Sequence, residues 1–319
     1  MHPALSIVFF TTLSGAGYGL LTWLGISVFL LQSRGGAVAP LASMQLLSAI
    51  IALVLVTAGL LCSLAHLGQP QRAWRALSQW RTSWLSREGV MALLTYVPAL
   101  TMTFLLWHGV RSTDEAGVLA LAGALTAVLS LATVACTAMI YASLKPIPAW
   151  RHPLVVPVYL VLSLLSGAAL LFVLMLWQLP GVASVSPVLP WLMLIALIAA
   201  LVKFVYWRDI DRAPLPADRA AAVGLPGRSV QTFEAPHTEA NYITREMVFR
   251  IARQHASRLR LLAYGLFAGA PLLLTLFGMA APSLVAFTLP MTTVSILAGV
   301  FVERWLFFAE ARHIVSLYY

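Results

Sequence analysis

Eight long runs of apolar residues follow one another along the chain, separated by short stretches that contain charged residues, proline or glycine. A helix needs about 20 consecutive apolar residues to cross the roughly 30 Å hydrocarbon core of a bilayer, because its backbone groups must be hydrogen-bonded internally there. The predicted transmembrane helices cover residues 5–31, 41–64, 89–107, 118–144, 154–177, 188–206, 261–279 and 284–308. The pattern therefore predicts an all-α integral membrane protein, a bundle of eight transmembrane helices that forms one domain over residues 1–319.

The composition supports the same class of protein. The chain is 61% hydrophobic and only 10% charged, whereas soluble domains are roughly 45–50% apolar and about 25% charged. A water-soluble fold is thereby excluded. We expect membrane lipid around the helices and no nucleic-acid partner.

The basic residues lie almost entirely on one side of the predicted helices. All but two of the 20 Lys and Arg residues fall in or next to the loops after the second, fourth and sixth helices, or near the C-terminal end. The exceptions are Arg34 and Arg111. Because short loops rich in Lys and Arg stay in the cytoplasm, this distribution predicts a bacterial inner-membrane protein with both termini and the main polar loops in the cytoplasm. A basic face that docks an acidic partner would produce the same asymmetry.

Two polar segments on that side, residues 65–88 and 207–260, are the predicted docking loops. Residues 213–236 are irregular and contain Pro and Gly, so we predict a loop there. From Asn241 the pattern turns helical and is expected to run into the seventh span. The candidate docking residues are Arg81, Arg87, Arg245, Arg250 and Arg253. The alternative for the second segment is a basic helix that lies against anionic lipid.

Motifs of soluble enzymes are missing from the sequence, which has no Gly-x-x-x-x-Gly-Lys and no His-Glu-x-x-His. Gly15, Gly17 and Gly19 lie inside the first span, where small residues let helices approach closely. The two cysteines, Cys62 and Cys136, are too few for an iron–sulfur cluster, which takes about four thiolates. We therefore expect no iron–sulfur cluster in this chain, and any electron transfer must use cofactors from elsewhere.

The connection between the second and third helices carries the candidate chemistry. His66 ends the second span and Glu88 begins the third, so a loop of this length can bring both side chains to one depth at the cytoplasmic boundary. Tryptophans alternate with arginines between them, as expected for a segment at the level of the lipid headgroups. These residues are Arg72, Trp74, Arg75, Trp80, Arg81, Trp84 and Arg87.

Quinone chemistry needs proton acceptors close to the lipid, and this connection contains candidate residues for that role. A quinol loses two protons with each pair of electrons, and its apolar tail partitions into lipid. A histidine, with an ordinary pKa of about 6.5, and a partly desolvated carboxylate are suitable proton acceptors for its head group. The spacing of His66 and Glu88 is equally explained by a helix-ending histidine and by a first-turn glutamate that interacts with the helix dipole.

At these residues the chain resembles the membrane-anchor family of dimethyl sulfoxide reductase. The matching motifs are HLGQPQRAWR at 66–75, WRTSWLSRE at 80–88, YASLK at 141–145 with Trp150 just beyond, and ERWLFFAEARH at 303–313. The similarity spans nearly the whole chain. It implies a complex of a molybdopterin catalytic subunit, a ferredoxin-like subunit with four iron–sulfur clusters, and this non-catalytic anchor, which exchanges electrons with ubiquinone or menaquinone.

The resemblance also implies roles for particular residues. His66 and Glu88 match family positions associated with quinol binding. Arg72, Trp74 and Arg75 would then support the quinone site or contact the iron–sulfur subunit. Residues 229–242, SVQTFEAPHTEANY, are most similar to anchors of cytoplasmic sulfite dehydrogenases. The resemblance therefore implies the anchor of a sulfite:quinone oxidoreductase, although the same anchor would oxidise menaquinol in a dimethyl sulfoxide reductase.

Two other functions are left open by the sequence. A b-type cytochrome needs two histidines at similar depth; His66 and His313 form the one suitable pair, since His108 falls on the opposite side, and we expect no haem. A secondary transporter usually places ionisable groups near mid-membrane and shows paired repeats. Here ionisable residues such as Lys203 and Glu303 lie toward the cytoplasmic ends, and no internal repeat is found.

Overall fold

The computed structural model describes residues 4–35, 39–65, 67–179, 186–213, 218–231, 233–234 and 255–317. Within these ranges the chain is helical, with short connections. The elements are α1 Leu5–Gln32, α2 Ala39–Ala65, η1 Pro70–Gln79, α3 Trp84–His108, α4 Thr113–Ala142, α5 Val155–Gln178, η2 Ser186–Val188, α6 Leu189–Arg212, α7 Arg219–Ala222, α9 Ala256–Tyr264, η4 Gly265–Gly269, α10 Ala270–Ala280, η5 Pro282–Leu284, α11 Val285–Ala309 and η6 Ile314–Leu317.

In the described part of the chain, eight helices are long and apolar enough to cross a membrane. They are α1 to α6, the continuous α9–η4–α10, and α11 with the preceding η5. The predicted number and approximate positions of the spans are confirmed. Several helices extend beyond the apolar runs, because polar residues can continue a helix past the hydrocarbon core. Thus α6 continues to Arg212, and α3 begins at Trp84.

Serine side chains fix where α3 and α4 begin. Ser83 and Ser112 adopt extended backbone conformations, and each hydroxyl accepts from the backbone N–H three residues further on. This arrangement satisfies one of the N–H groups that have no partner at a helix start. Gly109, with φ of 79°, ends α3, so a tight turn joins the two helices into an antiparallel pair.

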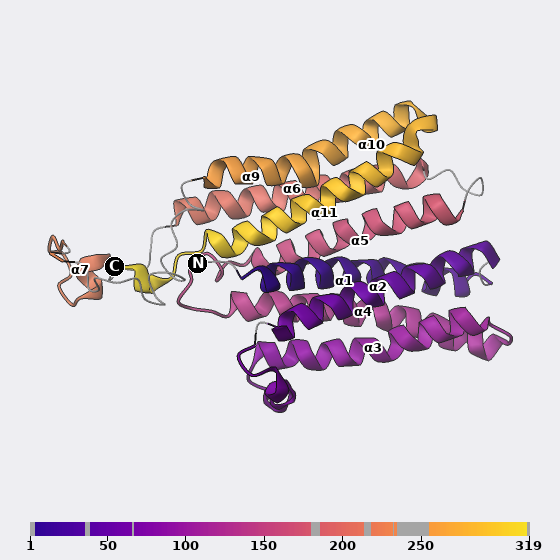
Figure 1. The fold of residues 1–319 in the computed structure, drawn as a ribbon, viewed down its shortest axis with the longest axis horizontal. Helices are drawn as coiled ribbons and strands as arrows, with labels where there is room; N and C mark the ends of the chain where they lie inside the picture. Colours follow the sequence, from indigo (N-terminus) through magenta and orange to yellow (C-terminus); the bar gives the residue numbers. More distant parts are fainter. Residues whose placement is uncertain are drawn as a thin grey trace.

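Helix α1 lies at the centre of the bundle (Figure 1) and packs against α2, α4, α5 and α11. Glycines allow its close crossing with α5: a Cβ atom at Gly19 would overlap the backbone of Ser163, and one at Gly167 would overlap the backbone of Gly19. Gly17 is packed in the same way against α2, whereas Gly15 faces open space. The predicted packing role therefore holds for Gly17 and Gly19 but not for Gly15.

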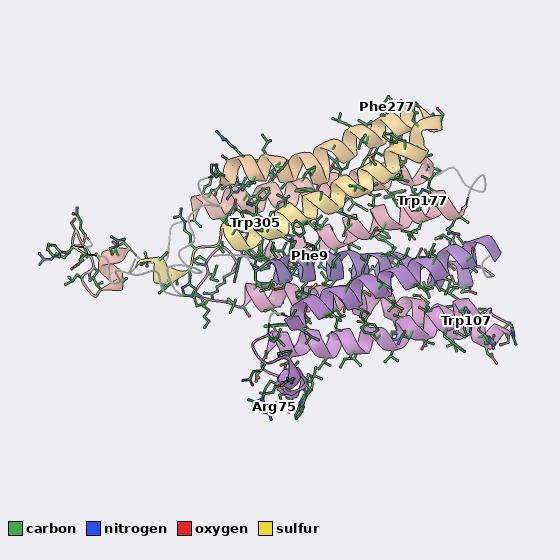
Figure 2. All side chains as sticks on the ribbon, viewed as in Figure 1. Phe9, Arg75, Trp107, Trp177, Phe277 and Trp305 are labelled. Atoms are coloured by element: carbon green, nitrogen blue, oxygen red, sulfur yellow. The ribbon has the colours of Figure 1, made fainter. Side chains whose placement is uncertain are left out.

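The two chain ends lie at the same end of the bundle, together with η1 and α7 (Figure 1). Trp107 and Trp177 lie toward the other end (Figure 2) and are 71% and 62% exposed. Exposed tryptophans at the end of a membrane helix are typical of the boundary between lipid and water. The bundle therefore has one end that carries most polar segments and an opposite end with short connections.

The predicted loop over residues 213–236 is wrong in one place, because it contains the one-turn helix α7. Asp218 begins this helix, and its carboxylate accepts from the N–H of Ala221 at 2.6 Å. Gly224, with φ of 79°, follows it, which is a conformation that glycine adopts without strain. The helix predicted from Asn241 lies largely outside the described residues, and the described part of the seventh span begins with α9.

The seventh span contains a π-helical turn, η4, which ends two residues before Pro271. A proline ring clashes with the carbonyl four residues earlier, and a wider turn relieves this clash. The carbonyl of Leu266 in this turn accepts a hydrogen bond from Ser295 of α11 at 2.7 Å. The irregular turn is thus tied to the neighbouring helix.

Candidate functional site

The connection between α2 and α3 forms a short 3-10 helix outside the bundle. None of the ten residues of η1 is buried, and Pro70 occupies its start, where a missing N–H is harmless. Trp74 and Trp80 are 67% and 52% exposed, and Arg75 lies at the outer edge of the molecule (Figure 2). This connection therefore presents a basic and aromatic surface.

Each tryptophan of this connection carries an arginine over its ring. The guanidinium-to-centroid distances are 5.5 Å for Arg75 over Trp74, 5.6 Å for Arg81 over Trp80 and 4.2 Å for Arg87 over Trp84. Arg87 also donates to the carbonyls of Trp80 at 3.0 Å and Arg81 at 2.7 Å. Arg87 therefore holds the turn that leads into α3. Arg72, Arg75 and Arg81 are exposed and remain docking or quinone-site predictions.

Glu88 is buried inside the bundle, at the start of the core-facing stripe of α3. This stripe continues through Ala92, Thr95, Ala99 and Met102, which recur every three or four residues on one helical face. Because Glu88 belongs to the stripe, its side chain points inward, and the residue is only 5% exposed. The carboxyl group thus lies away from the surface formed by η1.

The partner of Glu88 is a threonine on α4. The Thr137 hydroxyl lies 2.6 Å from Glu88 Oε1 and also 3.1 Å from the carbonyl of Thr133. A hydroxyl has one hydrogen and can donate to only one of these groups at a time. When Glu88 is ionised, Thr137 donates to it; when Glu88 is protonated, it can donate to Thr137, which then donates to Thr133. The hydrogen bond is compatible with both protonation states.

Four predicted site residues lie outside the described residues: His66, Arg245, Arg250 and Arg253. The pairing of His66 with Glu88 therefore stays a prediction. The described neighbours place the start of this loop, since α2 ends at Ala65 and the N–H of Leu67 donates to the carbonyl of Leu64 at 3.1 Å.

A second group of ionisable side chains is buried between α6 and α11. Lys203, Glu303 and Arg304 are 1%, 0% and 2% exposed. Lys203 Nζ contacts Glu303 Oε1, and Arg304 Nε donates to Glu303 Oε2 at 2.6 Å. The group holds two cations and one carboxylate. Buried charges are costly unless they are paired. Two aromatic ring faces stabilise the cations here: the Tyr159 ring lies 3.9 Å from the Arg304 guanidinium, and the Tyr206 ring lies 4.2 Å from Lys203 Nζ.

A second ion cluster lies next to this group and nearer the surface. Arg260 of α9 binds Asp211 of α6 at 2.5 Å and Glu310, just past α11, at 2.9 Å. The Trp207 ring lies between the two clusters, 4.6 Å from Lys203 Nζ and 5.4 Å from the Arg260 guanidinium. Taken together, the clusters hold three cations and three carboxylates and are neutral overall.

The later sequence motifs meet in one aromatic cluster beside these charges. Its ring centroids lie 5.1 to 6.1 Å apart, and its members are Tyr141, Trp150, Tyr159, Phe307 and Phe308. Trp150 also donates from Nε1 to the carbonyl of Phe307 at 2.9 Å. Residues of the motifs at 141–145 and 303–313 thus pack the ends of α4 and α11 against one another.

Three titratable groups just outside the spans have shifted pKa values. Burial lowers the pKa of His152, although Asp209, 3.6 Å from its Nε2, acts in the opposite direction. Burial also lowers the pKa of His313. Burial raises the pKa of Glu310, although the hydrogen bonds from Arg260 oppose this change. Both histidines therefore favour the neutral form in the folded protein.

One small cavity lies beside Thr137, and a much larger one lies far from Glu88. A cavity of about 20 Å³ is lined by Thr137 and Arg304, among others. A cavity of about 620 Å³ lies between the far ends of α1 to α4 and is lined by Leu105 and Gly109. It is thus at the other end of α3 from Glu88. In the described ranges no three His, Cys, Asp or Glu side chains are grouped as metal ligands.

Sequence reasoning identified Glu88 but missed its partner and the pairing of the buried charges. Thr137 is one of many hydroxyl residues in the spans, and it lies 49 positions from Glu88. Lys203, Glu303 and Arg304 did carry a signal, because ionisable residues inside predicted membrane spans are usually paired or functional. The amino-acid pattern does not say which of them meet.

These features define a class of protein: a polytopic membrane protein that is helical in its described ranges and whose buried ionisable groups gather toward one end. Residues 1–309 match the DMSO reductase anchor subunit (DmsC) family. The chain belongs to this family of membrane anchors, which confirms the predicted resemblance. A sulfite dehydrogenase subunit of Allochromatium vinosum is 33% identical over 337 aligned residues, covering 100% of this chain and 99% of that protein.

Proposed function

We propose that this chain is the quinone-reactive anchor of a sulfite:quinone oxidoreductase. In this proposal it does no catalysis on sulfite. It binds a ferredoxin-like iron–sulfur subunit, which in turn carries a molybdopterin catalytic subunit, and it passes the electrons released by sulfite to quinone. Membership of the anchor family and the full-length likeness to a sulfite dehydrogenase subunit support this assignment.

The observation that carries the proposal is the buried Glu88 carboxyl with its Thr137 hydrogen bond. Reduction of a quinone takes up two electrons and two protons, so the site must supply protons where electrons arrive. Glu88 can give one proton to a quinone oxygen and keep its hydrogen bond, because Thr137 can then donate to the carboxylate. His66 is proposed as the second acid–base group, with Arg72, Trp74 and Arg75 as supporting residues.

The quinone head would reach Glu88 from the face between α2 and α3. The cavity beside Thr137 has about 20 Å³, whereas pockets for small organic ligands have roughly 300–1,000 Å³, so the ring cannot enter there. On the α2–α3 face, the hydroxyls of Thr57 and Tyr96 lie 2.6 Å apart, and Thr57 is exposed. This polar pair, on helices otherwise rich in exposed apolar side chains, would face lipid and offer hydrogen bonds to an arriving head group.

The end that carries η1 is proposed to face the cytoplasm of a bacterial inner membrane. The excess of Lys and Arg at this end supports that orientation. The exposed residues Arg75 and Arg81, with Arg245, Arg250 and Arg253 in the second polar segment, would then dock the iron–sulfur subunit. Cytoplasmic docking suits oxidation of sulfite inside the cell.

A second candidate is the anchor of a dimethyl sulfoxide reductase, which would oxidise menaquinol. The family match supports it directly, because the family carries that name. The two candidates use the same quinone site in opposite directions. Co-purification of the partner subunits, followed by an assay with sulfite or dimethyl sulfoxide, distinguishes them.

The test of the quinone site is Glu88→Gln in the assembled complex. Gln keeps the size and the hydrogen bond to Thr137 but cannot carry a proton, so we expect quinone-linked turnover to fall by roughly 10²–10⁴-fold. The partner's activity with a soluble dye should stay unchanged. Glu115→Gln, at the other end of the bundle, is the matched control. Unchanged quinone-linked turnover in Glu88→Gln would reject the assignment, and His66→Ala tests the second proposed group in the same way.

A further inference from the structure

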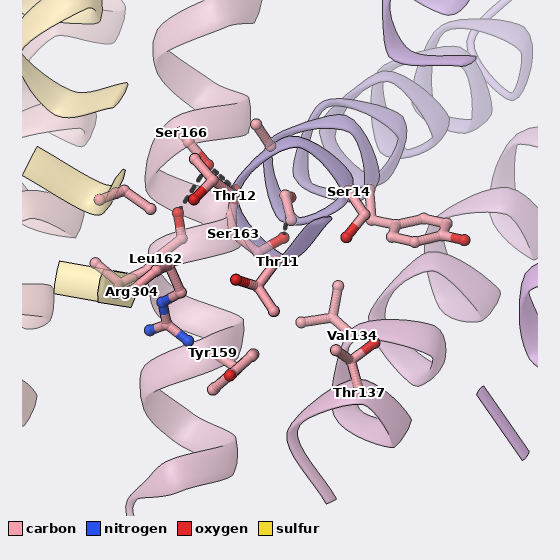
Figure 3. A pocket seen from close by; sticks show the side chains of 14 residues that line it. Thr11, Thr12, Ser14, Val134, Thr137, Tyr159, Leu162, Ser163, Ser166 and Arg304 are labelled. Carbon is pink, nitrogen blue, oxygen red and sulfur yellow. Dashed lines mark hydrogen bonds between the residues drawn. The ribbon is translucent and has the colours of Figure 1, made fainter. Parts of the chain in front are cut away.

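A small polar cavity lies inside the bundle between Glu88 and the buried ion cluster. Its walls come from α1, α4, α5 and α11, and its volume of about 20 Å³ is enough for one water molecule, which needs roughly 10–15 Å³. Figure 3 shows Thr11, Thr137, Tyr159 and Arg304 around this space. Polar atoms reach it from all four helices.

Several of these polar atoms are buried and have no hydrogen-bond partner among the described residues. They are the Thr12, Tyr18 and Tyr159 hydroxyls and both terminal nitrogens of Arg304. Thr12, Tyr159 and Arg304 are only 7%, 5% and 2% exposed. A buried polar group without a partner costs about 1–3 kcal/mol, and more when it is charged. Their grouping around one cavity is what a water site requires, since a buried water typically makes two to four hydrogen bonds.

The cavity is also linked to two buried carboxyl groups, those of Glu88 and Glu303, by one residue in each case. On one side, Thr137 lines the cavity and hydrogen-bonds Glu88 at 2.6 Å. On the other side, Arg304 lines it and donates to Glu303 at 2.6 Å. Beyond Glu303, the charges continue through Lys203 to the cluster of Arg260, Glu310 and Asp211, in which Asp211 is 57% exposed.

We propose that this cavity holds water bound by Arg304, Tyr159 and Thr12, and that this water carries protons between Glu88 and the buried ion cluster. The second half of the proposal rests on the proposed quinone reaction at Glu88, whereas the first half does not. In each turnover Glu88 gives one proton to the quinone and regains one through Thr137 from the water, which regains its own proton from the Tyr159 hydroxyl on the side of the ion cluster. Arg304 keeps its protons throughout and only orients the water, because a guanidinium is not deprotonated in proteins. Each oxygen of the chain accepts one proton and passes on another, so the chain is restored by rotation of its hydroxyl groups.

The first experiment tests for the water itself and uses the sign of a stability change. In a dry cavity, Tyr159→Phe and Thr12→Val would remove hydroxyls that have no partner, and the complex would become equally or more stable. With bound water, each variant removes a hydrogen bond, and the unfolding temperature of the purified complex should fall. Phe keeps the ring under Arg304, so the stacking is preserved.

Thr126→Val is the matched control, because Thr126 is a buried α4 hydroxyl that also has no partner within the described ranges and does not line the cavity. We expect this variant to be as stable as the parent. Lowered stability of the two cavity variants alone supports the bound water. Cavity variants that match or exceed the parent would overturn it.

The second experiment tests proton transfer in the intact complex. Tyr159→Phe and Thr12→Val should lower kcat for quinone-linked turnover roughly tenfold, less than the roughly 10²–10⁴-fold loss on removal of an acid–base group. They should also increase the solvent deuterium isotope effect, while KM for quinone and dye-linked activity stay unchanged. If Glu88→Gln stops turnover but the cavity variants keep the parent kcat and isotope effect, the proton route is rejected and the quinone site stands. If Glu88→Gln keeps full turnover, the quinone assignment and the route fail together, and the stability result alone decides the water site.

Discussion

At the scale of single residues, charged side chains inside this bundle are paired with side chains of opposite charge. Glu303 is fully buried and holds two cations, one on its own helix and one on α6. Breaking a buried ion pair by removing one partner costs about 3–5 kcal/mol, because the remaining charge has no counter-charge. Which partner is removed decides the cost here, since the group has one carboxylate for two cations.

We predict that Glu303→Gln is far more harmful than Lys203→Met. The first variant leaves Lys203 and Arg304 buried without a counter-charge, and we expect a loss of about 3–5 kcal/mol and little protein in the membrane. The second leaves Glu303 and Arg304 as a balanced pair and should cost much less. The membrane content of each variant and the unfolding temperature of its complex are the measurements. Equal losses in the two variants would contradict this charge balance.

The sequence suggests single candidate residues more readily than it suggests the residues that contact them. Glu88 could be chosen as a candidate because its motif resembles that of the anchor family, although its position alone also fits a first-turn glutamate that interacts with the helix dipole. Thr137 could not, because a threonine in a span is normally satisfied by its own helix backbone, as Thr137 also is through Thr133. The cavity beyond Thr137 depends on the relative rotation of four helices, which no local pattern encodes.

At the scale of elements, contact between α1 and α5 depends on residues without side chains. Apolar side chains gain little by meeting in lipid, so helices associate in membranes through close packing of small residues. At this crossing the backbones of Gly19 and Ser163 are in direct contact. The two halves of the bundle are thereby joined through their central helices.

We predict that Gly19→Ala destabilises the protein, whereas Gly15→Ala does not. A Cβ at Gly19 would overlap the Ser163 backbone, while a Cβ at Gly15 meets nothing within 4 Å. Overpacking typically costs about 1–3 kcal/mol, and more is expected here because the obstacle is backbone rather than a flexible side chain. Both variants add the same methyl group to the same helix. A comparison of their unfolding temperatures therefore isolates the crossing, and equal values would count against it.

The sequence predicted the long helices well and the irregular elements poorly. Apolar runs identify membrane helices because the bilayer imposes their length. The 3-10 helix η1 and the π-helical turn η4 are set by other causes. The first is tied to α3 by a hydrogen bond from Ser86 to the carbonyl of Ala76, and the second is tied to α11 by Ser295. Such contacts are not visible in apolar periodicity.

Two histidines stabilise connections at the ends of helices in the same manner. His152 Nδ1 accepts from the N–H of Leu154 at 3.2 Å, and His313 Nδ1 accepts from the N–H of Val315 at 3.0 Å. Protonation of Nδ1 would remove the acceptor. Burial lowers the pKa of both histidines, so the folded protein binds fewer protons than the unfolded chain in acid. Their contribution to stability is therefore present above the ordinary histidine pKa of about 6.5 and is lost as the pH falls below it.

We predict that the double variant His152→Asn and His313→Asn weakens this pH dependence. Asn can accept from the N–H two residues ahead and does not titrate, so the turns should persist. The unfolding temperature of the parent complex should fall more than that of the variant between about pH 7.5 and 5.5, with each lost hydrogen bond worth about 1 kcal/mol. Glu310 has a raised pKa and acts with the opposite sign, but it is common to both proteins. Parallel pH profiles would refute the histidine contribution.

At the scale of the whole molecule, the polar residues are concentrated at one end of an apolar bundle. That end carries both chain termini, η1 and α7 (Figure 1), as well as most of the basic residues. The opposite end is closed by short connections and carries Arg34 and Arg111. Two explanations account for this asymmetry, because arginines can bind anionic lipid or an acidic protein surface.

We predict that reversing the charge of Arg75 and Arg81 together, as Arg75→Glu and Arg81→Glu, releases the partner subunits from the membrane. Both side chains are exposed and lie over neighbouring tryptophan rings, so the anchor itself should insert normally. Like charges brought together at an interface cost several kcal/mol, so binding should weaken at least about tenfold. The measurement is the fraction of dye-linked catalytic activity that stays with purified membranes at several salt concentrations.

Arg34→Glu with Arg111→Glu is the matched control, with the same charge change at the other end of the bundle. If η1 only rests on lipid, both double variants will keep the catalytic activity on the membrane. If η1 is the docking surface, only the η1 variant will release it. In that case the parent complex should also become easier to strip at high salt, because exposed ion pairs are screened within about 8 Å at physiological ionic strength. If the η1 variant keeps the catalytic activity on the membrane even at high salt, these arginines bind lipid. The docking surface would then lie on the second polar segment.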